Sequence, residues 1–395
     1  MTRMWLLAAT LGTLVPSPLI ASEPVESEDA EGLSLSALYK GDVMANVGGG
    51  AKRGARALGN AELVADADLD RIAGWSGARA KLHLLSVHGG TPNALTGSLQ
   101  GVDNIEVADD RTKLYELWLE QEFASGHASL LAGLTDLNVE FYQNDAAGLL
   151  IAPAFGVGSE LAATGPNGPS IFPSTALAVR VAITPDDDSY VKLGLFNARA
   201  GVPGDKSGVD LSFSRGALAI AEAGLTKGGK LAVGVWRYTQ KQDDIHETDG
   251  AGNPASRTAQ GAYLLGERRI AGSEQGRQVN AFFRAGLSDG DTTPFRGGWQ
   301  AGLLVAPAIS GRPGSAISLG VNQAYVTSKF RRKAAEEGDT LGSSESAVEL
   351  TYQDKVAPFL TVQPDVQYVI NPGANRATRN ALLMGLRVIV SVPAE

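Results

Sequence analysis

Short runs in which apolar and other residues alternate with a period of two recur along this chain, and they constrain its fold more than any other feature. In residues 177–183, branched apolar residues occupy every second position around Ala178, Arg180 and Ala182. Residues 382–391 alternate in the same way near the C-terminus. Two residues is the repeat of a β-strand, whose successive side chains point to opposite faces. The pattern therefore predicts an all-β fold.

Two kinds of connection separate these runs. Some are tight, such as residues 184–188 and 226–230, and others are long and polar, such as residues 240–259 and 329–346. Alternation of short turns with long loops is typical of an up-and-down barrel in a membrane. The 395 residues, less a leader, leave roughly 23 residues for each of about 16 strands, enough for ~10 residues in the bilayer. We predict a transmembrane antiparallel up-and-down β-barrel of about 16 strands, with a soluble all-β domain as the alternative.

The N-terminus is typical of an export signal. Arg3 precedes an apolar stretch that begins at Trp5, and Pro16 ends that stretch before the small residues Ala21 and Ser22. The stretch is far shorter than the ~20 apolar residues that span a bilayer. We expect cleavage after Ala21 and export to a bacterial envelope. The predicted division is a signal peptide at 1–21, a mobile acidic N-terminus at 22–31 and a barrel domain at 32–395.

Composition excludes several classes of function. The chain has no Cys, four scattered His and a net charge of −9. A disulfide scaffold and a thiolate metal site are therefore excluded, and a negative chain is not expected to bind nucleic acid. Residues 204–208 lack the spacing of a phosphate-binding loop. We predict no metal, no cofactor, no catalytic residue and no enzymatic activity.

The segment 114–123 (LYELWLEQEF) is ambiguous between helix and strand. Its Leu and Glu content is compatible with a helix, but its alternation is that of a strand. We interpret it as a strand. One face then carries Tyr115, Leu117 and Leu119, and the opposite face carries Glu116, Trp118 and Glu120.

Several segments are similar to those of a known family. Residues 39–43 (YKGDV) are followed by residues 46–50 (NVGGG), and residues 131–141 read LAGLTDLNVEF. Residues 362–373 (VQPDVQYVINPG) are among the most specific matches. In this order, the segments resemble the carbohydrate-selective porins of the OprB family, and the likeness runs from about residue 39 to residue 390. The chain departs from the usual pattern of outer-membrane barrels by ending in VPAE rather than in an aromatic residue.

The resemblance implies a cell outer-membrane porin through which sugars diffuse passively in a water-filled barrel. The expected partners are small sugars as solutes and outer-membrane lipid around the barrel. The expected assembly is a monomer or a homo-oligomer such as a trimer. A general or cation-preferring porin for small solutes remains open, as does a soluble or surface-attached β-structured binding protein.

Alternation also selects candidate pore-lining residues. A charge on the lipid face costs ~2–4 kcal/mol for Arg or Lys at mid-depth, so charged positions opposite apolar rows are expected to face the lumen. There, polar groups can bind sugar hydroxyls and an aromatic ring can stack on the sugar. Wall packing or an internal ion pair is the alternative for each residue, and Trp118 has the further alternative of an anchor at the membrane boundary. The predicted set is Arg79, His83, Glu116, Trp118, Glu120, Arg180, Lys192, Glu349 and Arg387.

Overall fold

A computed structural model describes residues 32–273 and 275–393 of the chain. The predicted signal peptide at 1–21 and the acidic segment at 22–31 lie outside the described residues. Among the residues that are described, no helix is both long enough and apolar enough to cross a membrane.

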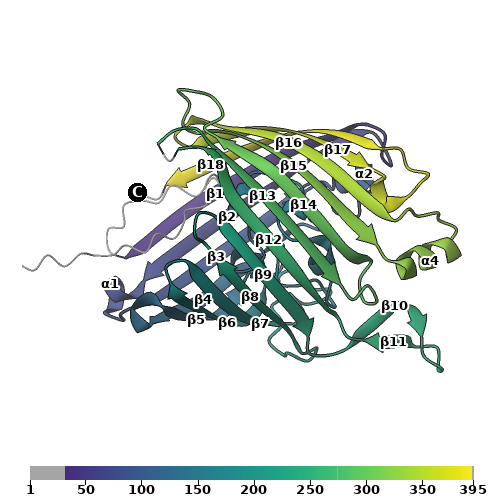
Figure 1. Ribbon diagram of the computed structural model, residues 1–395, viewed down its shortest axis with the longest axis horizontal. Helices are drawn as coiled ribbons and strands as arrows, with labels where there is room; N and C mark the ends of the chain where they lie inside the picture. The colour runs from purple at the N-terminus through teal and green to yellow at the C-terminus, as the bar shows by residue number, and fades with distance from the viewer. Residues whose placement is uncertain (1–31, 274, 394–395) are drawn as a thin grey trace, which may run out of the picture.

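Sixteen strands of the described chain form one closed antiparallel barrel (Figure 1). Each strand pairs with the next one in the sheet, and β1 pairs with β18 to close the barrel. The strands are β1 (Leu33–Gly48), β2 (Gly54–Asp68), β3 (Ala78–Gly89), β4 (Arg111–Phe123), β5 (Ala128–Thr135), β6 (Ala176–Asp186), β7 (Ser189–Asn197), β8 (Ala217–Leu225), β9 (Lys230–Tyr238), β12 (Gln260–Gly272), β13 (Gln278–Ser288), β14 (Phe295–Ala306), β15 (Ser315–Val326), β16 (Ser344–Ala357), β17 (Leu360–Ile370) and β18 (Ala381–Pro393). The predicted fold class is confirmed.

The two ends of the barrel differ in their connections. At the end where β1 begins and β18 finishes, which we call the turn end, β6 and β7 are joined by a tight turn and α1 (Leu69–Ala73) joins β2 to β3. At the opposite end, the loop end, a small hairpin of β10 (Gln242–Thr248) and β11 (Pro254–Arg257) and the helix α4 (Ser328–Glu336) project beyond the barrel (Figure 1). This hairpin and this helix occupy two of the long connections that the sequence predicts.

Burial follows the predicted alternation on most strands. On β6, Val179 and Ile183 are exposed on the outer face, whereas Ala178 and Arg180, on either side of Val179, are buried on the inner face. Apolar rows on the outer face and charged side chains on the inner face are the arrangement expected of a barrel that crosses a membrane, because lipid cannot solvate charges.

The long connection between β5 and β6, residues 136–175, folds into the barrel, and we call it the inner loop. Its Leu137, Phe141 and Tyr142 are fully buried and pack against inward-facing side chains of the wall, such as Phe196 and Trp236. Burial of several large apolar side chains favours a position of the loop against the wall. The connection between β3 and β4, residues 90–110, also turns inward, and we call it the β3–β4 loop. It contains the short helix α2 (Asn93–Thr96).

The predicted strand at 114–123 is confirmed as β4, but one of its faces was predicted wrongly. His83 pairs with Glu116 and Leu84 pairs with Leu114, so Tyr115 is an extra residue at a β-bulge. A bulge changes the side to which side chains point. Tyr115 is therefore buried on the inner face, where its hydroxyl donates a hydrogen bond to Asp136, instead of lying outside with Leu117.

Candidate functional site: a polar cavity inside the barrel

A cavity of about 530 Å³ lies between the wall strands β1 to β4 and the two inward loops. The wall contributes charged and amide side chains, and the loops contribute further carboxyl, amide and aromatic groups. Among its lining residues are Lys40, Asn60, Glu62, His83, Gln100, Asp103, Asn104, Glu106, Tyr115, Asp136, Asn138 and Phe172. Such a mixture of hydrogen-bonding groups and rings suits a hydroxyl-rich solute.

The wall side of the cavity holds a chain of ion pairs across four strands. Lys40 Nζ on β1 lies 3.1 Å from Glu62 Oε1 on β2. His83 on β3 lies between two carboxylates, with Nε2 3.2 Å from Glu62 Oε2 and Nδ1 3.4 Å from Glu116 Oε2. Each charged side chain in this row of ion pairs therefore has a partner of opposite charge.

The loop side carries carboxyl groups with few partners. Glu106 is half-buried and accepts a 2.9 Å hydrogen bond from the backbone N–H of Asn93. Burial raises the pKa of Glu106 to about 7. Asp136 is almost fully buried, and burial raises its pKa to about 7 as well. Each of these groups therefore changes charge near neutral pH.

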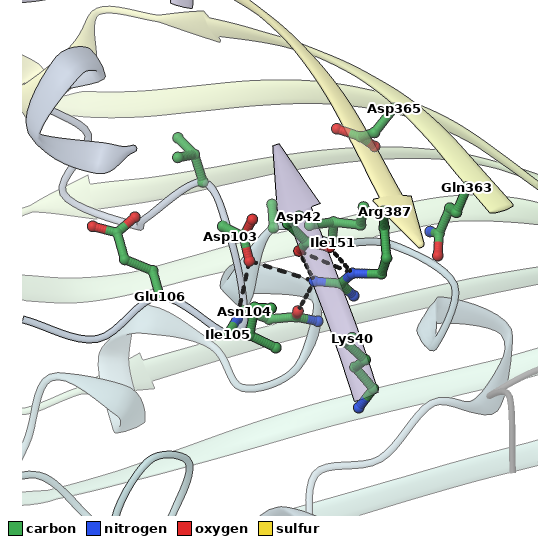
Figure 2. A network of polar contacts seen from close by, with 12 residues as sticks. Lys40, Asp42, Asp103, Asn104, Ile105, Glu106, Ile151, Gln363, Asp365 and Arg387 are labelled. Carbon is green, nitrogen blue, oxygen red and sulfur yellow. Dashed lines mark hydrogen bonds and ion pairs between the residues drawn. The ribbon is translucent and has the colours of Figure 1, made fainter. Parts of the chain in front are cut away.

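A buried network ties the β3–β4 loop to the seam between the first and last strands (Figure 2). Arg387 on β18 binds Asp42 on β1 with two nitrogens, at 2.9 Å (Nε to Oδ1) and 2.6 Å (Nη2 to Oδ2). Its Nη2 also donates to Asn104 Oδ1 at 2.7 Å and lies 3.4 Å from Asp103 Oδ1. Burial and the neighbouring Asp42 raise the pKa of Asp103 well above its ordinary value. Arg387 thus holds the part of this loop that lines the cavity.

Buried polar side chains of the wall clamp the inner loop. Glu349 on β16 is fully buried and accepts hydrogen bonds from the backbone N–H groups of Ile151 and Ala152. Arg284 on β13, also fully buried, donates to the carbonyl oxygen of Tyr142 at 3.0 Å and to those of two further loop residues. These bonds satisfy loop backbone groups that would otherwise be buried without partners.

A second ladder of charges runs from β4 to β7. Arg180 Nη2 lies 2.7 Å from Glu120 Oε1, and Arg180 Nε lies 3.0 Å from Glu140 Oε2 on the inner loop. Lys192 Nζ lies 3.3 Å from the same Glu140 oxygen. These ion pairs hold Glu140, near the start of the inner loop, against the wall strands β6 and β7.

Two predicted residues lie toward the turn end of the barrel. Arg79 forms an ion pair with Glu122, and both side chains are partly exposed. The Nζ of Lys81 lies 5.7 Å from the centre of the Trp118 ring. Neither Arg79 nor Trp118 borders the cavity.

The structure thus separates the nine predicted residues into groups. Only His83 lines the cavity, while Glu116 and Arg387 contact residues that do. Sequence reasoning missed the lining that comes from the two loops, because loops have no alternation to reveal which way a side chain points. One signal was available, since the family-like segment 131–141 includes both Asp136 and Asn138. In the described part of the chain, no group of His, Asp and Glu side chains is arranged to hold a metal ion.

Comparison with known proteins gives a consistent result. The profile of the family described as "Carbohydrate-selective porin, OprB family" matches residues 52–391. Porin B of Pseudomonas aeruginosa is 22% identical over 403 residues, which cover 91% of this chain and 87% of that protein.

Solved structures show the same architecture. The structure of Pseudomonas putida OprB at high pH is 24% identical and has a TM-score of 0.80, over 92% of this chain and 94% of that one. The outer-membrane channel DcaP of Acinetobacter baumannii is 10% identical, with a TM-score of 0.57, over 91% of this chain and 97% of that one. At these identities the likeness shows the fold.

Proposed function

The chain belongs to the carbohydrate-selective porin family OprB, and on that premise we propose that sugars diffuse passively through its barrel by way of the polar cavity at β1 to β4. The protein is an outer-membrane porin. Family members and the relatives above are channels, and we assign this chain no catalytic role. We further propose that outer-membrane lipid surrounds its apolar outer face, and that it acts as a monomer or as a homo-oligomer such as a trimer.

The observation that carries the proposal is the chemistry of the cavity lining. A sugar presents hydroxyl groups around its edge and an apolar face on its ring. Asn104 and Asn138 offer amides, Lys40 offers an ammonium donor, and the half-buried Phe172 offers a ring face. Single hydrogen bonds to a wet wall hold a solute weakly, so the solute can leave again, as conduction requires.

The predicted residues take different roles in this proposal. His83 borders the cavity with both ring nitrogens bound to the carboxylates of Glu62 and Glu116, so its role is to hold the charged wall in place beside the solute. Arg387, Glu349, Arg180, Glu120 and Lys192 position the loops that narrow the barrel. We propose that Arg79 and Trp118 meet solute only after it has passed the cavity, toward the turn end.

Two measurements test the proposal together. Purified full-length protein in planar bilayers should show an ion current that glucose reduces in a concentration-dependent way. In liposomes, the same protein should allow glucose to enter and cause swelling. A stable current that no sugar reduces, together with no glucose entry, would contradict sugar passage.

A general or cation-preferring porin is the second candidate. The net charge of −9 and the carboxyl-rich cavity lining favour it. Reversal potentials in a salt gradient distinguish the two, because a general porin would show ion preference without sugar-dependent block. A soluble binding protein does not fit the rows of exposed Leu and Val on the outside of the barrel, such as Leu193 and Val235.

A further inference from the structure

One carboxyl group in the cavity lining differs from the others in having no cation beside it. Glu62 is paired with Lys40 and His83, and Asp103 is paired with Arg387. In the described part of the chain, Glu106 forms no ion pair, and its one hydrogen-bond donor is the Asn93 backbone N–H. Figure 2 shows the Glu106 side chain pointing away from the Arg387 guanidinium.

Glu106 is also accessible to a solute in the cavity. It is half-buried on the β3–β4 loop, whereas Asp136, which also lacks a cation, is almost fully buried and is occupied by the Tyr115 hydroxyl. The cations at the cavity, Lys40 and His83, are both already bound to carboxylates. Among the described groups that line the cavity, Glu106 is therefore the accessible carboxylate whose charge has no cation beside it.

We propose that the Glu106 carboxylate makes this cavity prefer sugars that carry a protonated amine over neutral sugars, and disfavour sugars that carry a carboxylate. An ammonium group can donate to the unoccupied oxygen of Glu106, and the bond is charge-assisted. A sugar carboxylate in the same place meets the like charge of Glu106 with no free cation to compensate. The inference rests on the proposed function, because it requires sugars to enter this cavity.

Burial raises the pKa of Glu106 to about 7, so the preference for amino sugars should be present above this pH and lost below it. Above this value the carboxylate is charged and binds the ammonium, and below it the protonated acid does not. The other titratable or charged groups that face the cavity are Lys40, Glu62, His83, Asp103, Tyr115 and Asp136. A variant that removes only Glu106 therefore separates its contribution from theirs.

Three hexoses that differ only at carbon 6 serve as probes: 6-amino-6-deoxyglucose, glucose and glucuronate. At pH 8 we expect the amino sugar to block the current of the full-length protein at roughly three- to ten-fold lower concentration than glucose, since the site is partly wet. Glucuronate should block least. Lowering the pH to 5.5 should remove the advantage of the amino sugar, because the amine and the sugar acid keep their charges over this range while Glu106 does not.

Substitutions assign the effect to the residue. Glu106→Gln should abolish the amino-sugar preference at pH 8 and its dependence on pH, and Glu106→Asp should retain part of both. Glu337→Gln removes the same charge from an exposed position beside α4, away from the cavity, and should leave the preference intact. A preference that persists in Glu106→Gln would overturn the proposal.

The experiments distinguish failure of sugar passage from failure of the role assigned to Glu106. If glucose enters liposomes but all three sugars block equally, the assignment to Glu106 is overturned and sugar passage stands. If none of the three sugars alters the current or enters liposomes, sugar passage is contradicted and the inference falls with it. Should Glu106→Gln fail to insert, the pH dependence of the unaltered protein decides, and a preference that does not change between pH 5.5 and pH 8 overturns the proposal.

Discussion

Arg387 on the last strand lies directly opposite Asp42 on the first strand in the register of the barrel seam, and the two side chains bind each other through two nitrogens and two oxygens. Both are almost fully buried. The pair thus joins the two ends of the sheet and, through Asn104, fixes the β3–β4 loop to the same point.

Removing one partner of this pair should weaken the barrel strongly. Arg387→Met leaves Asp42 buried without its cation, which costs about 3–5 kcal/mol in free energy of unfolding. The urea midpoint in detergent, or the temperature at which the folded band unfolds on a gel, measures the loss. The double variant Arg387→Met with Asp42→Leu should recover part of it, because Asp42 is then no longer buried without its cation, although Asp103 still loses its contact with Arg387. Equal stability of Arg387→Met and the unaltered protein would show that the seam does not depend on this pair.

Loosening the inner loop should widen the passage without opening the barrel. Glu349→Ala removes the acceptor for the Ile151 and Ala152 N–H groups, and each unsatisfied buried donor costs about 1–3 kcal/mol. We expect a larger and noisier single-channel conductance with normal barrel formation. Glu349→Gln keeps one acceptor oxygen and should show a smaller change. If the conductance of Glu349→Ala is unaltered, other contacts suffice to hold the loop.

The aromatic ring that contacts a sugar should be that of Phe172. It borders the cavity and lies 6.5 Å from the Tyr115 ring between ring centres, whereas Trp118 lies outside the cavity. Loss of an aromatic contact of about 0.5–1.5 kcal/mol corresponds to a roughly two- to ten-fold weaker sugar block. We expect this loss in Phe172→Ala and a smaller one in Trp118→Ala, measured as the glucose concentration that halves the current. The reverse order would place the sugar nearer the turn end.

At the loop end, the β10–β11 hairpin should stay attached to α4 until the pH is strongly acidic. Asp244 is buried, which raises its pKa, but hydrogen bonds from Lys329, Arg257 and two backbone N–H groups outweigh burial and hold the pKa well below its usual range. A lowered pKa means that the stabilising contribution is present above the ordinary value for Asp and is lost only as pH falls through the lower, folded-state value.

Limited proteolysis of the 240–259 segment measures this attachment. Cleavage should be constant from neutral pH down to about pH 4, near the ordinary pKa of an Asp side chain, and should rise below it. Asp244→Asn should be cleaved faster at neutral pH, because Lys329 then lacks its nearest carboxylate. Asp243→Asn removes the same charge from the neighbouring, exposed position on β10, serves as the control and should behave as the unaltered protein does.

The alternation of the strands was enough to predict the barrel and the side to which most wall residues point. A period of two leaves only two choices of face, and the cost of a charge in lipid selects between them, as for Arg180. The face of Tyr115 was predicted wrongly because one extra residue at a bulge shifts the inward–outward alternation, and the amino-acid composition does not reveal the bulge.

The narrowing of the barrel could not be predicted in the same way. Glu349 has the pattern of a residue that faces water, yet two loop N–H groups cover it, and those groups belong to residues 198 and 197 positions earlier in the chain. The residues next to Glu349 in the sequence give no sign that distant loop N–H groups bind it. The cavity lining from Asn104, Glu106 and Phe172 depends on loops whose path is set by these distant bonds.

The clamps on the inner loop also imply an order of events during assembly. The loop is synthesised early, after β5, but the wall residues that hold it, Arg284 and Glu349, belong to β13 and β16, which leave the ribosome much later. Bonds between such distant parts of a chain form only after the intervening segments are in place. The passage therefore cannot reach its final width until β13 and β16 have joined the sheet, so the narrowing of the pore is tied to late steps of barrel assembly.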